Sequence, residues 1–295
     1  MNAETAAAPN TDEFFAKVAT KSDSGALRGD YSQADANYVV QQNHGAYTEE
    51  EHALWRRLYQ RQEKLLPGRA CDEFIEGLAL LDAANGIPDF AKTNLALAKA
   101  TGWQLVAVPG LIPEQAFFEH LANCRFPVSV WLRKPEEFDY IVEPDVFHDF
   151  FGHVPLLFNP IFARHMQDYG KGGLKALTLG GLDMLARLYW YTVELGLIRG
   201  KDGLRIYGAG ILSSGGEVEY CLNSPKPLRV PFNVQRILQT LYKIDTYQET
   251  YFVIDSFQQL FDDTAPDFTP YYERIGKLEP HAANTLLPGE QNIAP

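Results

Sequence analysis

Apolar residues that recur every three or four positions run through most of this chain and favour a mainly helical fold. In residues 70–84, for example, Phe74, Leu78 and Leu81 would lie on one face of a helix. The same spacing, with capping residues and prolines, predicts further helices at residues 48–66, 88–101, 113–123, 182–197 and 233–241. Strand-like runs are shorter, at residues 103–108, 128–132, 204–212 and 250–254. We therefore expect an α+β fold, mainly α with short β-strands.

Helical order begins abruptly at Thr48, where Thr48-Glu49-Glu50-Glu51 has the pattern of a capping box. The preceding residues 1–46 are polar and dotted with Gly and Ser, which is typical of an extended N-terminal arm. Residues 47–271 are predicted to form one domain, and residues 272–295 a polar C-terminal tail. Because the tail has no heptad pattern of the kind that joins helices into bundles, we expect a monomer.

Composition and charge argue against several other classes of protein. The formal net charge is -12, and no basic stripe interleaves with aromatic residues, so nucleic acid is not an expected partner. The N-terminus lacks the basic start and apolar run of a signal peptide, and no run approaches the roughly 20 apolar residues of a membrane helix. Cys71, Cys124 and Cys221 show no C-x-x-C spacing, which argues against a disulfide framework. These features predict a cytoplasmic protein with no membrane partner.

Two histidines, His148 and His153, lie five residues apart in the segment EPDVFHDFFGHVPLL. On a regular α-helix a step of five residues turns about 140°, so the two imidazoles would point to different sides. They can meet at one metal ion only if the helix ends or distorts between them, and Gly152 and Pro155 are predicted to provide that ending. A helix cap and a core histidine are the alternative interpretation of this pair.

A third ligand is available on the helix predicted at residues 182–197. Glu194 is flanked there by Val193 and Leu195, and an unpaired carboxylate in such apolar surroundings would be costly to bury. A metal ion would offset that cost. Two imidazoles and one carboxylate form a facial triad that leaves positions open on Fe(II), although the spacing alone does not separate iron from zinc or manganese.

Other residues near these three suggest a place for an organic substrate. Arg133, in WLRKP, could bind a carboxylate through two parallel hydrogen bonds, or it could be a solvated charge at the end of a strand. Tyr189 and Trp190 lie about one helical turn before Glu194, where they could line a pocket or simply be core aromatic residues.

Five segments of this sequence resemble the aromatic amino acid hydroxylases, which are pterin-dependent iron enzymes. The strongest matches are EPDVFHDFFGHVPLL, ARLYWYTVELGL and RIYGAGILSSGGEVEYCL, and the weaker ones are WQLVAVPGLIP and TYFVIDSF. They occur in one order between Thr48 and Asp267, and the likeness is greatest to the short prokaryotic-type phenylalanine 4-hydroxylases. The resemblance implies a single basket-like catalytic domain over residues 47–271, with short strands among its helices.

The resemblance also implies roles for individual residues. The implied iron ligands are the three residues singled out above, His148, His153 and Glu194. Two further residues, Tyr189 and Glu143, are implied as catalytic. The residues implied for substrate binding are Arg133, Asp145, Pro144, Trp190 and Ser213. Those implied for the pterin are Gly110, Leu111, Ile112, Phe117, Asp149 and Ala186.

The reaction implied by the same resemblance is the conversion of L-phenylalanine to L-tyrosine. It uses O2 and tetrahydrobiopterin, or a related tetrahydropterin, at a mononuclear non-haem Fe(II). Ile244 stands where the tyrosine-specific relatives carry an acidic residue, which favours phenylalanine over tyrosine. Hydroxylation of tryptophan or tyrosine is the first alternative, and a zinc hydrolase is the second.

The chain departs from the animal members of the family at two positions of these motifs. The animal members carry Glu in place of Asp149 and Phe in place of Leu195.

Overall fold

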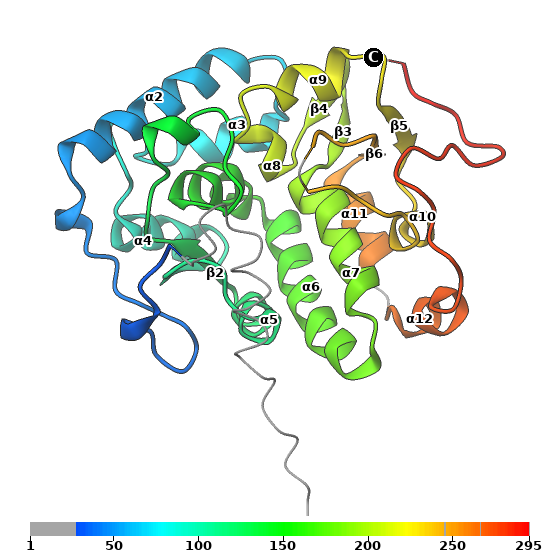
Figure 1. Ribbon diagram of the computed structural model, residues 1–295, viewed down its shortest axis with the longest axis horizontal. Helices are drawn as coiled ribbons and strands as arrows, with labels where there is room; N and C mark the ends of the chain where they lie inside the picture. The colour runs from blue at the N-terminus through cyan, green and yellow to red at the C-terminus, as the bar shows by residue number, and fades with distance from the viewer. Residues whose placement is uncertain (1–27, 245, 266, 295) are drawn as a thin grey trace, which may run out of the picture.

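Helices form most of the regular structure in the computed structural model, which describes residues 28–244, 246–265 and 267–294 (Figure 1). The α-helices are α2 (Glu49–Leu65), α3 (Asp72–Ala79), α4 (Phe90–Ala100), α5 (Glu114–Ala122), α6 (Pro160–Leu179), α7 (Leu182–Tyr189), α8 (Ala209–Leu212), α9 (Glu217–Asn223), α10 (Val234–Leu238), α11 (Phe257–Thr264) and α12 (Thr269–Ile275). Shorter 3-10 or π-helical segments are η1 (Tyr31–Gln33), η2 (His44–Ala46), η3 (Pro135–Glu137), η4 (Phe147–His153), η5 (Val154–Phe158) and η6 (Trp190–Glu194). The prediction of a mainly helical α+β fold is confirmed.

Short strands among the described residues form two small sheets. β1 (Gln104–Val108) and β2 (Arg125–Ser129) pair in parallel, with Leu105 opposite Phe126. The second sheet has the order β4-β3-β6-β5 and consists of β3 (Leu197–Gly200), β4 (Gly203–Ile206), β5 (Leu228–Pro231) and β6 (Thr250–Ile254). β3 pairs antiparallel with β4, whereas β6 pairs in parallel with both β3 and β5. Every residue of β6 is buried, so this strand joins the sheet to the helical core.

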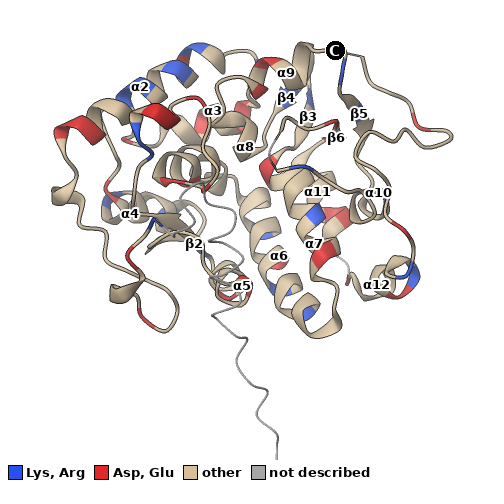
Figure 2. Ribbon diagram, in the orientation of Figure 1, with Lys and Arg blue, Asp and Glu red and all other residues tan. Residues whose placement is uncertain are grey.

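The predicted capping box begins α2. Thr48 Oγ1 accepts a hydrogen bond from the N–H of Glu51 at 3.2 Å, and Glu51 Oε2 accepts one from the N–H of Thr48 at 2.8 Å. Acidic residues fill the first turn of the helix, where the positive end of the helix dipole stabilises them (Figure 2). The apolar face of α2 then buries Trp55 and Leu58 completely, which fixes the helix to the core.

Two predicted elements end earlier than expected. The helix predicted at residues 182–197 is confirmed through residue 194, where α7 has passed into the π-helical η6, and the chain then enters β3. The strand predicted at residues 204–212 is wrong beyond β4, because the chain turns into α8. A Cβ at Gly208 would lie 2.4 Å from the N atom of Gly196 and 2.5 Å from the carbonyl oxygen of Glu194. This close approach turns the chain, and an apolar run alone does not separate a strand from a short buried helix.

The bounds of three further elements differ from those predicted. The helices predicted at residues 70–84 and 233–241 are α3 and α10, and each is shorter than its predicted range. The strand predicted at residues 128–132 is β2, which begins and ends three residues earlier. Arg133 therefore follows the strand after a short loop instead of ending it.

The described part of the predicted N-terminal arm packs along β1 and β2. Residues 1–27 of the arm lie outside the described residues. The N–H of Val40 donates to the carbonyl oxygen of Ala107 at 2.9 Å, and the Tyr47 hydroxyl donates to that of Val130 at 2.8 Å. These bonds place the chain that precedes α2 beside the two parallel strands.

The predicted C-terminal tail packs against β5 and α10. Arg236 forms an ion pair with Glu290 at 2.8 Å, and the N–H of Ile293 donates to the carbonyl oxygen of Arg229 at 2.7 Å. In Figure 1 this red segment runs along the outside of the β5 edge. The tail thus covers one side of the second sheet.

No membrane span is found among the helices of residues 28–244, 246–265 and 267–294, since none is both long and apolar enough. Even α6, with 20 residues, carries Arg164, Asp168, Lys171 and Lys175.

The helix α6 begins at the cap residue Asn159 and ends at Gly180, which has the left-handed conformation with a φ of 69°.

Candidate active site

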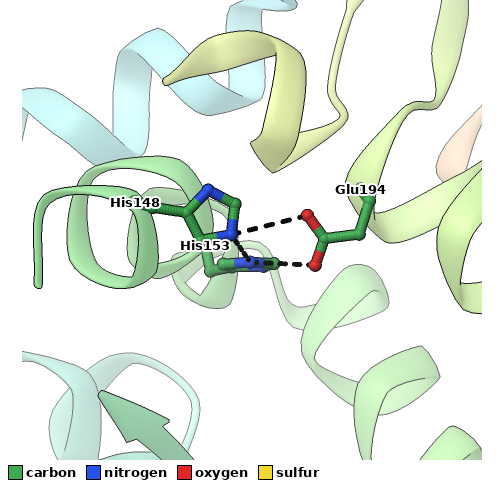
Figure 3. Close-up of side chains that lie close together, drawn as sticks. All are labelled: His148, His153 and Glu194. Atoms are coloured by element: carbon green, nitrogen blue, oxygen red, sulfur yellow. Dashed lines mark hydrogen bonds and ion pairs between the residues drawn. The ribbon is translucent and has the colours of Figure 1, made fainter. Parts of the chain in front are cut away.

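Three side chains that are far apart in the sequence converge at one point. His148 and His153 come from η4 and face Glu194 at the end of η6 (Figure 3). His153 Nε2 lies 3.4 Å from His148 Nε2 and 3.3 Å from Glu194 Oε1, and His148 Nε2 lies 3.6 Å from Glu194 Oε2. One ligand atom from each residue lies within 4.8 Å of the other two, so the three residues can hold one metal ion.

The two histidines meet because η4 is a π-helix. Backbone hydrogen bonds in a π-helix join residues five apart, so side chains with that spacing leave the helix on nearly the same side. His148 and His153 have this spacing within η4. The predicted distortion of the helix is confirmed, whereas the ending expected at Gly152 and Pro155 is wrong, since η4 runs through Gly152. Gly152 instead permits close packing, because a Cβ there would lie 2.8 Å from the carbonyl oxygen of Ala209 in α8.

Glu194 is held by a second π-helical turn, and the glycines of YGAGI pack against it. The carbonyl oxygen of Glu194 would lie 3.1 Å from a Cβ at Gly210, and its Oε2 atom 3.4 Å away. These glycines therefore let α8 approach the carboxylate closely. π-helical turns are rare in proteins and are found frequently at functional sites. The presence of two of them here therefore indicates a functional site.

The donor atoms fit a divalent metal ion. Bonds of about 2.0–2.2 Å that meet at roughly 90–110° place neighbouring ligand atoms roughly 3.0–3.5 Å apart, close to the separations seen here. Burial, only partly opposed by the charge of Glu194, lowers the pKa of His148, so its imidazole is neutral, as a metal ligand must be. Burial alone would raise the pKa of Glu194, but His153 and His148 lower it below its ordinary value. The carboxylate is therefore ionised and ready to bind a cation.

Ser213 orients His148 from the side opposite the converging atoms. Its Oγ lies 3.0 Å from His148 Nδ1 and donates to the carbonyl oxygen of Ala209 at 2.9 Å. Because the hydroxyl proton is used in that bond, Oγ accepts from Nδ1–H, which leaves the Nε2 lone pair directed at Glu194. The hydrogen bond thus selects the tautomer that a metal requires.

Replacing Ser213 by alanine is expected to weaken iron binding about 10- to 100-fold, the usual effect of losing a partner behind a ligand histidine. The measurement is the Fe(II) dissociation constant by competition with a chelator. Ser256→Ala is the matched control, because Ser256 caps α11 and its Oγ accepts from the N–H of Gln259. Equal iron affinity in the Ser213 variant and the parent would contradict this role.

Arg133 and Asp145 form a buried ion pair beside the histidines. Arg133 Nε donates to Asp145 Oδ2 at 2.8 Å and Nη2 donates to Oδ1 at 2.9 Å, and the side chains are 3% and 0% exposed. Asp145 Oδ1 also accepts from the N–H of His148 at 3.0 Å. Burial alone would raise the pKa of Asp145, but the Arg133 charge and these hydrogen bonds lower it. One carboxylate therefore fixes both the arginine and the start of η4.

Trp190 and Tyr189, which are predicted to line a ring pocket, each stack on a neighbouring ring. Trp190 stacks on Tyr242 with ring centroids 4.8 Å apart, and its buried Nε1 has no hydrogen-bond partner among the described residues. Tyr189 stacks against His153 with centroids 6.4 Å apart. Pro144 is half-buried and directly precedes the buried Asp145.

The residues predicted for the pterin fall into two groups. Phe117 packs edge to face against Tyr189, with ring centroids 5.7 Å apart, and Tyr189 in turn stacks on His153. One aromatic ring, that of Tyr189, therefore separates Phe117 from His153. The carbonyl oxygen of Ala186 accepts from the N–H of Trp190. Asp149 Oδ2 accepts from the N–H of Ser129 at 2.8 Å, and burial raises the pKa of Asp149.

The other group is the loop of residues 109–112, with Glu143 beside it. Ile112 is buried, and a Cβ at Gly110 would lie 3.0 Å from Glu143 Oε1. The buried Glu143 carboxylate interacts with the backbone N–H groups of Arg28 and Leu111. Burial raises the pKa of Glu143, although the Arg28 charge opposes the rise. Of the two residues predicted as catalytic, Tyr189 contacts a ligand histidine and Glu143 contacts this loop.

Sequence reasoning missed two residues of α2 that support Ser213. Arg61 Nη2 donates to the carbonyl oxygen of Ser213 at 3.2 Å, and Gln62 Nε2 donates to that of Ser214 at 3.0 Å. Gln62 is completely buried and follows Leu58 by four residues, so it lies on the apolar face of α2. A polar residue at such a position in the sequence could have identified Gln62 as a residue with a buried hydrogen-bond partner. Ile244, in contrast, is 51% exposed, and its side chain is not enclosed by the site.

Two imidazoles and one carboxylate on a single face, set in a helical domain, are typical of mononuclear non-haem iron oxygenases. Residues 26–277 match the family described as biopterin-dependent aromatic amino acid hydroxylase. The chain belongs to this family, as its motifs predict.

Relatives and solved structures agree with that assignment. The chain is 57% identical over 281 residues to a phenylalanine-4-hydroxylase of Ralstonia nicotianae, covering 95% of this chain and 88% of the relative. It is 61% identical over 258 residues to that of Chromobacterium violaceum, covering 87% of each. The iron- and phenylalanine-bound crystal structure of the Chromobacterium violaceum phenylalanine hydroxylase has a TM-score of 0.85 and 56% identity, covering 94% of this chain and 99% of that chain.

Proposed function

We propose that this protein is a tetrahydropterin-dependent monooxygenase that converts L-phenylalanine to L-tyrosine at a mononuclear Fe(II). The observation that carries the proposal is the convergence of His148, His153 and Glu194 within 4.8 Å. It occurs in a chain 57% and 61% identical to two phenylalanine-4-hydroxylases. A structure 56% identical to the chain is described as bound to iron and phenylalanine, which supports the same metal and substrate here.

In this proposal, His148, His153 and Glu194 hold the iron on one face and leave the opposite positions open for O2 and substrate. Bound Fe(II) together with the reduced pterin supplies the activation of O2, which protein side chains alone do not provide. Ser213 keeps His148 in the required tautomer. Tyr189 shields one side of the centre by stacking on His153.

The substrate carboxylate binds Arg133. Asp145 accepts hydrogen bonds from Nε and Nη2 of the guanidinium. Nη1, which does not bond to Asp145, is the nitrogen that donates to the carboxylate of the substrate. Trp190 and Pro144 flank the aromatic ring of the substrate. Because Asp145 also bonds to the backbone of His148, the substrate anchor and the metal ligand are fixed relative to each other.

The pterin stacks on Phe117 and bonds to the backbone of residues 110–112. The ring contacts from Phe117 to Tyr189 and from Tyr189 to His153 support a pterin site next to the metal. Asp149, Ala186 and Glu143 border the same space in this proposal. Asp149 is one methylene shorter than the glutamate of the animal members, so a water molecule would bridge it to the pterin.

A zinc hydrolase would use the same three ligands with a carboxylate beside the first histidine as general base. Here that residue is Asp149, and its Oδ2 already accepts a hydrogen bond from the N–H of Ser129. The relatives also favour hydroxylation. We further propose that the protein acts as a monomer in the cytoplasm, where its three free cysteines stay reduced.

The test is product analysis with Fe(II), tetrahydrobiopterin and O2, each aromatic amino acid being supplied in turn. Tyrosine should form from phenylalanine, and omission of iron or pterin should abolish it. Faster turnover of tryptophan or tyrosine would move the protein to the first alternative. Hydrolytic activity with Zn(II) and no pterin would overturn the proposal.

A further inference from the structure

Residues 28–33 pack against the loop of residues 109–112, to which the pterin is proposed to bind. The Tyr31 hydroxyl donates to the carbonyl oxygen of Leu111 at 2.7 Å. A Cβ at Gly29 would lie only 1.7 Å from the carbonyl oxygen of Pro109, so the two backbones are in direct contact and only glycine fits there. This segment and the loop form one packed unit.

The segment is fixed at its start as well as at Tyr31. The Arg28 guanidinium lies 5.1 Å from the centre of the Trp131 ring and forms an ion pair with Glu137. A cation over an indole ring and an ion pair together give the segment two anchors besides the tyrosine. The Tyr31 hydroxyl is therefore held at the loop by contacts on its N-terminal side.

Glu143 and Trp131 lie on the same side of Gly110 as the Tyr31 hydroxyl. A Cβ at Gly110 would lie 3.0 Å from Glu143 Oε1, 3.0 Å from the Tyr31 hydroxyl and 3.4 Å from Trp131 Nε1. The 5% exposed Glu143 interacts with the backbone N–H groups of Arg28 and Leu111, and Nε1 of Trp131 has no hydrogen-bond partner among the described residues. Tyr31 and Glu143 thus both meet the loop at Leu111, Tyr31 through the carbonyl oxygen and Glu143 through the N–H.

The bond to Leu111 also determines the direction of a second backbone group. The Leu111 carbonyl and the Ile112 N–H belong to one planar trans peptide, so they point in opposite directions. A hydroxyl that fixes the direction of the Leu111 carbonyl therefore also fixes the direction of the Ile112 N–H. That N–H is one of the backbone donors proposed to bind the pterin.

We propose that Tyr31 is a positioning residue for the pterin, acting through the peptide that joins Leu111 to Ile112. The inference rests on the proposed function. Loss of the hydroxyl should raise the KM for tetrahydropterin about two- to tenfold, the effect of one net hydrogen bond. The kcat at saturating pterin and the KM for phenylalanine should stay within about twofold, because the Tyr31 hydroxyl acts on the loop that is proposed to bind the pterin.

The experiment compares Tyr31→Phe with the full-length parent. It measures the KM for tetrahydrobiopterin and, independently of turnover, the dissociation constant of 7,8-dihydrobiopterin by calorimetry. Tyr47→Phe is the matched control, because its hydroxyl likewise bonds a backbone carbonyl, that of Val130 at 2.8 Å. A general loss of stability would affect both variants, whereas the pterin effect should appear only in Tyr31→Phe.

Weaker pterin binding in Tyr31→Phe alone supports the inference. Unchanged pterin binding, or an equal change in Tyr47→Phe, overturns it. The proposed function fails separately, if the parent forms no tyrosine from phenylalanine. A parent that is active while Tyr31→Phe matches it would remove the role of Tyr31 and leave the proposed function intact.

Discussion

Glu194→Gln should retain its fold and lose iron together with hydroxylation. The amide has the shape of the carboxylate and can still hydrogen-bond to His153, which lies 3.3 Å from Oε1. It has lost the negative charge that draws a cation to two neutral imidazoles. Since groups behind a ligand already change affinity 10- to 100-fold, loss of a ligand should cost more than about 100-fold in iron affinity. Iron content after gel filtration and tyrosine formation measure the effect.

Glu217→Gln is the matched control for this variant. Glu217 is also a buried glutamate, and it accepts hydrogen bonds from Tyr251 and from the N–H of Gln248. Burial raises its pKa, so an uncharged glutamine should replace it with little effect on iron or activity. Equal iron content in both variants would show that Glu194 is not a metal ligand.

Asp145→Asn should be strongly destabilising and should also weaken phenylalanine binding. The change leaves the 3% exposed Arg133 side chain without its counter-charge, and breaking a buried ion pair in this way costs about 3–5 kcal/mol. The guanidinium would lose its fixed orientation, so the KM for phenylalanine should rise at least about tenfold. Urea unfolding and steady-state kinetics measure the two effects.

Glu290→Gln is the control for Asp145→Asn, because its pair with Arg236 is more exposed and lies on the tail. It should cost less stability and leave the KM for phenylalanine unchanged. The pKa of Asp145 lies below its ordinary value, so its stabilising effect is present above about pH 4 and is lost as the pH falls further. The free energy of unfolding should thus fall less on acidification in Asp145→Asn. Parental stability and KM in that variant would refute the role of the pair.

Local patterns predicted much of this fold and all three converging residues. The capping box at Thr48 and the strand at residues 250–254 occur where the sequence places them, because each depends on neighbouring residues alone. The three proposed metal ligands could be predicted for a different reason. A histidine pair with an unusual spacing and a carboxylate in an apolar helix are both costly unless something binds them.

Contacts between distant segments account for what the sequence did not reveal. The turn at Gly208 depends on close approach to Glu194, and the π-helical form of η4 depends on packing of Gly152 against Ala209. Neither contact leaves a periodic signal. Tyr31 lies in a polar segment whose sequence favours an arm, and only the position of Leu111 in space gives its hydroxyl a partner.

The most direct test is a crystal structure of the Fe(II)-loaded protein with anomalous data collected at the iron absorption edge. A single strong anomalous peak is expected, bonded to His148 Nε2, His153 Nε2 and a carboxylate oxygen of Glu194 at about 2.0–2.2 Å. A peak at any other group of side chains, or iron-loaded protein without density between these three residues, would contradict the account.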